Sequence, residues 1–179
     1  MRVKGFTLIE LVVVIVLLGV IAVVAAPRYL DFRVDGKIAV MNNFASALRS
    51  GVDLVHAKAV IQGQEGKTGK ADLGNGTNLD LAYGYPDMNY GNLDSHIAKL
   101  SGWLDAEVVN RQTNKDWPRE VMTMDRSQVG LDGAKRVIQF FFMSDSKAGL
   151  VNSKFECMVQ YQNATESSAP IITTYLDAC

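Results

Sequence analysis

The hydrophobic pattern of the first third of the chain has two parts. From Leu11 to Ala26 sixteen consecutive residues carry no polar side chain, and the apolar run starts at Phe6, interrupted only by Thr7 and Glu10. As a helix, Phe6 to Ala26 covers roughly 30 Å, enough to span a bilayer. Two cations precede the run, at positions 2 and 4, and they predict a cytoplasmic N-terminus with the remainder of the chain translocated.

Beyond Pro27 apolar residues continue at steps of three and four, which is typical of one face of an amphipathic helix. This stripe consists of Leu30, Val34, Ile38, Met41, Ala45, Leu48, Val52, Val55 and Ala59. We therefore predict one long helix from Phe6 to Ile61, membrane-spanning over residues 6–27 and amphipathic over residues 28–61. Lys37 falls on the stripe and would have to extend its ammonium group outward. Gly36 and Gly51 are unfavourable within a helix, so we expect close packing at both.

The remainder, residues 62–179, predicts one globular domain. Residues 62–78 are rich in Gly and polar residues and predict a loop. Asp94 or Ser95 is expected to cap a short helix that runs to Leu104, whereas Trp103–Asp132 shows no clear pattern. The expected strands lie within Leu79–Tyr85, Val137–Met143, Phe155–Tyr161 and Ile171–Tyr175. Three or four antiparallel strands packed on the apolar face of the long helix give an α+β fold.

Composition and motifs exclude several classes of function. The 179-residue chain has a formal charge of −1 and contains no cluster of basic residues, so nucleic-acid binding is not expected. His56 and His96 are interpreted as surface residues, because neither lies at a metal-ligand or catalytic spacing. No catalytic motif and no cofactor-binding or metal-binding motif is found, and without a Walker loop any motor must be another protein. We expect a protein that is not an enzyme.

Two cysteines, Cys157 and Cys179, lie on the translocated side. Such compartments are oxidising, so a disulfide is expected rather than two free thiols. In the chain-entropy model a bond closing a loop of about 22 residues stabilises a domain by roughly 3 kcal/mol.

Glu10 is a carboxylate inside the apolar run, and its burial in lipid costs on the order of 3 kcal/mol, so a partner is expected. The sequence Gly5-Phe6-Thr7-Leu8-Ile9-Glu10 resembles the class III leader junction of type IV pilins. The resemblance implies that a prepilin peptidase removes residues 1–5 by cutting between Gly5 and Phe6, and that the new amino terminus is methylated. It also implies that Glu10 governs subunit addition, and that Gly19 and Pro27 loosen and kink the helix.

Further segments resemble pilins of the mannose-sensitive haemagglutinin (MSHA) type: residues 26–30, 59–63, 83–86 and the closing cysteine pair. This resemblance implies a homopolymeric surface filament for attachment to surfaces or host glycans. It also implies a single-pass inner-membrane stage, an assembly platform and a separate ATPase. A minor pilin and a pseudopilin of a type II secretion system are the alternatives. A membrane-tethered enzyme lacks any supporting residues.

Overall fold

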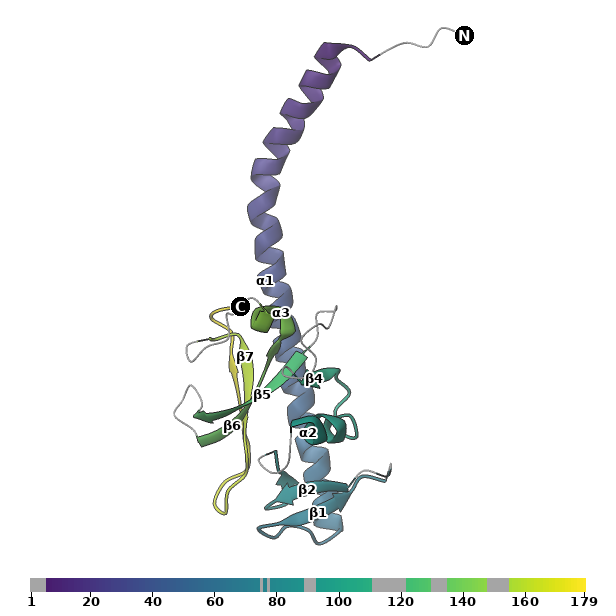
Figure 1. Ribbon diagram of the computed structural model, residues 1–179, viewed down its shortest axis with the longest axis vertical. Coiled ribbons are helices and arrows are strands. Elements are labelled where there is room, and N and C mark those ends of the chain that lie inside the picture. Colours follow the sequence, from purple (N-terminus) through teal and green to yellow (C-terminus); the bar gives the residue numbers. More distant parts are fainter. Residues whose placement is uncertain are drawn as a thin grey trace, which may run out of the picture. The chain divides into compact units, whose positions relative to one another are not determined.

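The computed structural model describes residues 6–74, 76, 78–88, 93–110, 122–129, 135–147 and 155–179. It divides into two compact units, residues 1–37 and residues 38–179 (Figure 1). The first unit contains the N-terminal part of helix α1 (Leu8–Ile61). The second contains the rest of α1, two β-sheets and two short helices.

Helix α1 is 54 residues long and unbroken, which confirms the long helix predicted from the hydrophobic pattern. It starts two residues later than expected, at Leu8, and its helical backbone continues through Gly19 and Pro27. The stretch Leu8–Ala25 is long and apolar enough to cross a membrane. All its side chains are exposed within their own unit, so no described residue of that unit covers this apolar surface.

In the second unit the predicted apolar stripe of α1 is buried from Met41 to Ala59. The buried face also contains Phe44, which the stripe of three- and four-residue steps had left out. Ile38, the first stripe residue in this unit, is only half-buried. In the first unit, Val34 is 40% exposed and Lys37 is half-buried. The side chain of Leu30 lies outside the described residues. The amphipathic pattern therefore corresponds to a domain-packed face over Met41–Ala59.

The first sheet is three-stranded and antiparallel, in the order β1–β2–β3, with strands Gly69–Asp72, Asn78–Ala82 and Tyr85–Pro86. Strands β2 and β3 confirm the strand expected within Leu79–Tyr85. Strand β1 corrects the loop predicted for residues 62–78. Its Asp72 backbone is held by the side chain of Gln62 at the end of α1, whose amide oxygen accepts from Asp72 N and whose amide nitrogen donates to Asp72 O.

The second sheet is five-stranded, in the order β4–β5–β6–β7–β8. Its strands are Val108–Asn110, Met122–Val129, Lys135–Phe142, Met158–Gln162 and Ile171–Tyr175. The last three confirm the three strands expected in the C-terminal part. The first two lie in the stretch that showed no clear pattern, and they pair in parallel, whereas every other pair is antiparallel. The domain thus has two sheets where one antiparallel sheet was expected.

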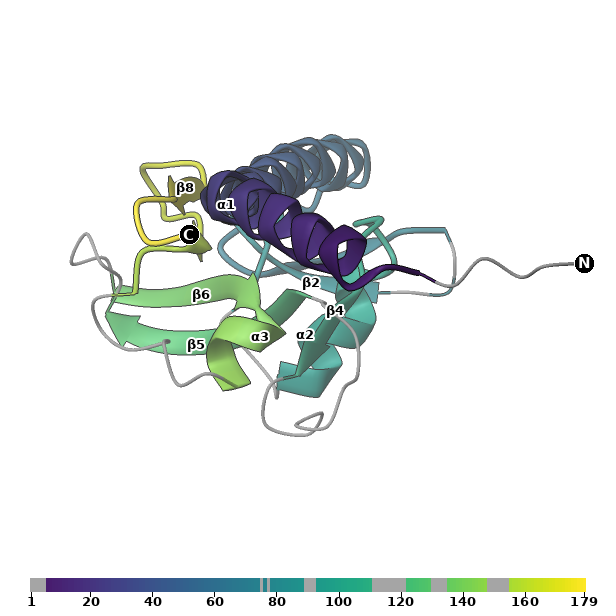
Figure 2. The same ribbon diagram turned by 90° about the horizontal axis from the view of Figure 1, so that it is seen from above.

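Two short helices complete the second unit, α2 (Leu93–Leu100) and α3 (Met143–Lys147). Helix α2 ends four residues earlier than predicted, although Leu104 is buried in the turn region that follows. The helix begins at Leu93, so Asp94 and Ser95 lie within its first turn and do not precede it. Figure 2 shows α2 beside β4 and α3 at the end of β6. Helix α3 begins at Met143, which was expected to end the preceding strand.

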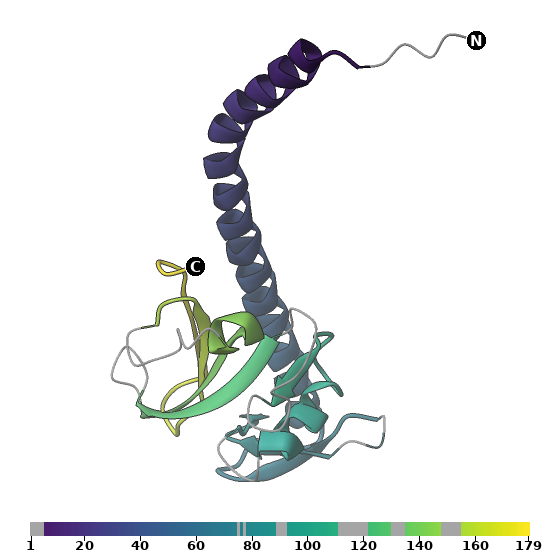
Figure 3. The same cartoon turned by 45° about the horizontal axis from the view of Figure 1, so that its top comes forward.

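The core has two main clusters, both built on the buried face of α1. Figure 3 shows the C-terminal part of this helix running beside the strands. The larger lies against the five-stranded sheet, where the rings of Phe44 and Phe140 are 5.0 Å apart. The smaller lies under the three-stranded sheet and consists of Val55, Ala59, Ala71, Leu73, Leu79 and Leu81. One helical face thus supports both sheets, which confirms the α+β architecture.

Candidate functional site

The start of helix α1 forms a capping box between Thr7 and Glu10. The Thr7 backbone N–H and hydroxyl donate to Glu10 Oε2 at 2.9 and 2.7 Å. In return, the Glu10 N–H donates to the Thr7 hydroxyl oxygen at 3.3 Å. This reciprocal arrangement satisfies amide groups that the first helical turn cannot pair internally. Within the described chain, the carboxylate therefore accepts two hydrogen bonds from Thr7.

Thr7 was given no role from the sequence, although Thr-Leu-Ile-Glu fits the Thr-x-x-Glu signature of a capping box. A cut between Gly5 and Phe6 would leave the Thr7 amide intact, so the capping box can persist in a shortened chain. A carboxylate offers about four acceptor positions, and Oε2 takes two hydrogen bonds within the described residues. Glu10 is exposed, so Oε1 is open to a donor from another molecule.

The other expected processing and hinge residues are placed only in part. Gly5 lies outside the described residues, and Phe6 is 75% exposed, just ahead of the helix. At Gly19 a Cβ would meet nothing within 4 Å. Within its own unit this glycine is therefore not required by packing.

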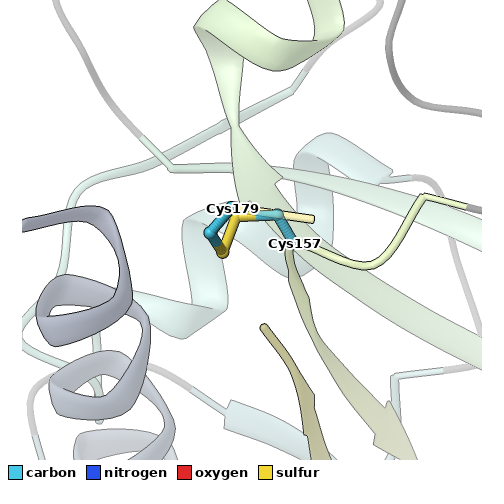
Figure 4. The surroundings of a disulfide bond; sticks show 2 residues. All are labelled: Cys157 and Cys179. Atoms are coloured by element: carbon cyan, nitrogen blue, oxygen red, sulfur yellow. A yellow bond between two sulfur atoms is a disulfide. The ribbon is translucent and has the colours of Figure 1, made fainter. Parts of the chain in front are cut away.

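The disulfide between Cys157 and Cys179 is present, with Cα atoms 4.7 Å apart (Figure 4). Cys157 is buried at a bend directly before β7, not within the strand as predicted. The backbone N–H of Ala178 donates to Glu156 O at 3.0 Å, next to the bond. The bond therefore fastens the residues that follow β8 to the start of β7.

His56 corrects the prediction of a surface histidine. It is half-buried, and its ring stacks on Tyr85 with centroids 4.0 Å apart and planes inclined by 6°. Its Nδ1 lies 3.1 Å from the carbonyl oxygen of Gly84, which requires a proton on Nδ1. The side chain joins α1 to the turn before β3 and has a structural role. The side chain of His96 lies outside the described residues.

Within the described part of the chain, His, Cys, Asp and Glu side chains nowhere gather in groups of three that could hold a metal ion.

Comparisons with known proteins also single out the N-terminal part of α1. Residues 1–26 match the family model described as the prokaryotic N-terminal methylation motif. The chain is 28% identical to the type IV major alpha-pilin of Moraxella bovis and 32% identical to fimbrial protein Q of the same organism. Each match covers 72% of this chain and 82% of the relative.

A shorter match, 42% identical, covers 34% of this chain and 53% of the type IV narrow pilus major component PilA5 of Thermus thermophilus. No solved structure matches the chain. The N-terminal motif, the long helix under a β-sheet and the extended identity to fimbrial proteins place this chain in the type IV pilin family.

Proposed function

We propose that this protein is the structural subunit of a type IV pilus and polymerises through its N-terminal helix into a surface filament. The observation that carries the proposal is the exposed apolar stretch Leu8–Ala25, which has one carboxylate near its start. Such a surface requires either lipid or other apolar helices around it. Membrane residence before assembly and a helical filament core after assembly provide these two environments in succession.

Processing follows from the N-terminal motif. A prepilin peptidase cuts between Gly5 and Phe6 and the new amine of Phe6 is methylated, which preserves its positive charge. Removal of residues 1–5 takes away Arg2 and Lys4, which changes the formal charge from −1 to −3. The chain then depends on its apolar helix alone to stay in the inner membrane.

Glu10 sets the position of an incoming subunit. The amine of Phe6 in one copy and the Glu10 carboxylate of an adjacent, axially staggered copy attract strongly in an apolar core, where an unpaired charge costs several kcal/mol. The capping box supports this role because it fixes the carboxylate at the helix start and leaves Oε1 free to accept. Without this pairing, copies could slide along uniform Leu and Val surfaces.

Gly19 and Pro27 loosen the helix within the filament. Pro27 has no amide hydrogen to donate, and Gly19 adds backbone freedom. Lipid offers a single subunit no other hydrogen-bond partner, which keeps the helix continuous. Neighbouring copies in a filament can tolerate a loosened stretch between these two residues, which allows extension under load.

The finer assignment is an MSHA-type major pilin used for attachment to surfaces or glycans, supported by the sequence segments at residues 26–30, 59–63 and 83–86 and by the C-terminal disulfide. Its partners are further copies of itself, the prepilin peptidase, an assembly platform and a separate ATPase. Electron micrographs of cells with and without the gene test the proposal. Long external filaments that depend on the gene are expected, and their absence from expressing cells would refute it.

A further inference from the structure

A cleft of about 240 Å³ opens in the second unit, where helix α1, strand β3 and the start of strand β8 come together. Its lining includes residues of all three elements: Arg49, Val52, Asp53, Tyr85, Pro170 and Ile172. Val52 is 3% exposed and lies at the bottom, whereas Arg49 and Asp53 are exposed at the rim. Sites for drug-sized ligands measure about 300–1,000 Å³, so the occupant of this cleft is a smaller molecule.

Two of the side chains that line the cleft are held in place by their own chain. The Tyr85 ring is stacked on His56 with the ring centroids 4.0 Å apart, which covers one of its faces and fixes its position. Arg49 Nη2 donates to the carbonyl oxygen of Ile172 at 3.2 Å, which uses one of the five N–H groups of the guanidinium. Groups that are fixed beforehand lose less conformational entropy when a ligand binds.

Arg49 and Asp53 bring opposite charges to the cleft without pairing with each other. They are four residues apart on α1, a spacing at which side chains are neighbours. The guanidinium is instead bonded to β8, and the Asp53 carboxylate makes no hydrogen bond or ion pair with another described residue. An anion would be repelled by Asp53 and a cation by Arg49, and an apolar molecule would displace water from both charges without replacing it. The cleft therefore suits a ligand that carries both charges close together.

We infer that the cleft binds a zwitterionic α-amino acid with an apolar side chain. Its carboxylate accepts hydrogen bonds from Arg49, and its ammonium group donates to Asp53. The flat guanidinium fork matches a carboxylate, and hydrogen bonds between charged groups are about twice as strong as neutral ones, which favours an amino acid over a sugar. The apolar side chain lies over Val52, beside the Tyr85 ring. This binding site goes beyond the proposed function and does not depend on filament formation.

The test titrates the full chain in detergent micelles with L-leucine, N-acetyl-leucine and leucinamide, and follows the backbone amide signals of Tyr85 and Ile172 by NMR. N-acetyl-leucine lacks the ammonium group, and leucinamide lacks the carboxylate. We expect saturable shifts with L-leucine and binding weaker by about fivefold or more for either derivative, because each loses one charge-assisted hydrogen bond. Equal binding of the three compounds, tighter binding of methyl glucoside, or the absence of saturable shifts with L-leucine would overturn the proposal.

Variants of the two rim residues assign each charge. Arg49→Gln and Asp53→Asn should each weaken the binding of L-leucine by about fivefold or more, and Arg49→Lys should retain part of it. The control Asp105→Asn removes an exposed carboxylate of the same unit outside the cleft and should leave the affinity within about twofold.

A structural disturbance is separated from a lost contact by the derivatives. Arg49→Gln should not weaken leucinamide further, and Asp53→Asn should not weaken N-acetyl-leucine further, because in each case the group that the residue binds is already absent. Further weakening in these two combinations, or an equal effect of Asp105→Asn, would overturn the assigned contacts.

Discussion

Gly51 on α1 provides a sensitive test of how the helix packs in the second unit. A Cβ at this position would lie 2.7 Å from Cε3 and 3.0 Å from Cζ3 of the Trp103 ring, and 3.1 Å from the Trp103 carbonyl oxygen. Non-bonded carbon atoms do not approach each other to 2.7 Å, so the Trp103 ring and the backbone that carries it must move. Gly51→Ala therefore creates an overpacked contact against a rigid group.

Two terms determine the size of the effect. Overpacking in a well-packed core costs about 1–3 kcal/mol, and a ring contacted together with its own backbone belongs at the upper end. Replacing Gly by Ala within a helix gains about 1 kcal/mol. The net expectation is a loss of about 2 kcal/mol, or a melting temperature lower by about 4–8 °C for a chain of this size.

Gly36→Ala is the matched control, because a Cβ there meets nothing within 4 Å. Gly36→Ala should show only the gain in helix propensity, which stabilises the helix by about 1 kcal/mol. Denaturant unfolding of the full chain in detergent micelles, followed by near-UV circular dichroism, measures both variants. A Gly51→Ala variant as stable as Gly36→Ala would refute the close packing. In a Trp103→Leu background the loss from Gly51→Ala should become smaller, because the ring contacts are gone and only the 3.1 Å contact with the carbonyl oxygen of residue 103 remains.

Three further predictions concern the second unit. Replacing Cys157 and Cys179 together by Ser should cost about 3 kcal/mol and lower filament yield, and free-thiol labelling of both cysteines in the folded, non-reduced protein would contradict the bond. Phe140→Ala should cost about 3–5 kcal/mol by denaturant unfolding, because the ring is fully buried against Phe44, and a loss below 1 kcal/mol would contradict this packing. Burial raises the pKa of the Tyr161 phenol, whose hydroxyl donates to Pro86 O at 2.8 Å. The native state retains a proton that the unfolded chain releases above about pH 10, so stability should fall by about 1.4 kcal/mol per pH unit above that value. Tyr161→Phe should reduce the loss in the free energy of unfolding by about 1.4 kcal/mol per pH unit above about pH 10. An unchanged pH dependence in this variant would contradict the assignment to Tyr161.

The parts of the fold that follow from local pattern were predictable from the sequence. Apolar residues recur with a clear periodicity in strands β6 to β8 and along α1, where they predicted both the length of the helix and its buried face from Met41 to Ala59. At Gly51 the sequence also indicated close packing correctly. At Gly36 a Cβ would meet no described atom of the single chain within 4 Å, so close packing there stays a prediction.

The parts that depend on distant partners were not predictable. Strand β1 has the composition of a loop and is held by β2 and by Gln62. Strand β4 has three residues, and pairs in parallel with β5, where the Thr123 hydroxyl donates to Val109 O at 2.9 Å. His56 lies on the polar side of α1 by periodicity, yet Tyr85 covers it. In each case the deciding contact comes from another part of the chain.

The central claim is that Glu10 positions subunits for polymerisation, and filament formation by Glu10→Ala tests it most directly. Cells expressing Glu10→Ala, Glu10→Asp or the unaltered chain are compared by immunoblot for cleavage and membrane level, and by electron microscopy for filaments. Glu10→Ala should be cleaved and inserted normally yet produce few or no filaments, and Glu10→Asp should be intermediate because it keeps the charge with a shorter reach. Filaments from Glu10→Ala in the numbers made by the unaltered chain would contradict the account.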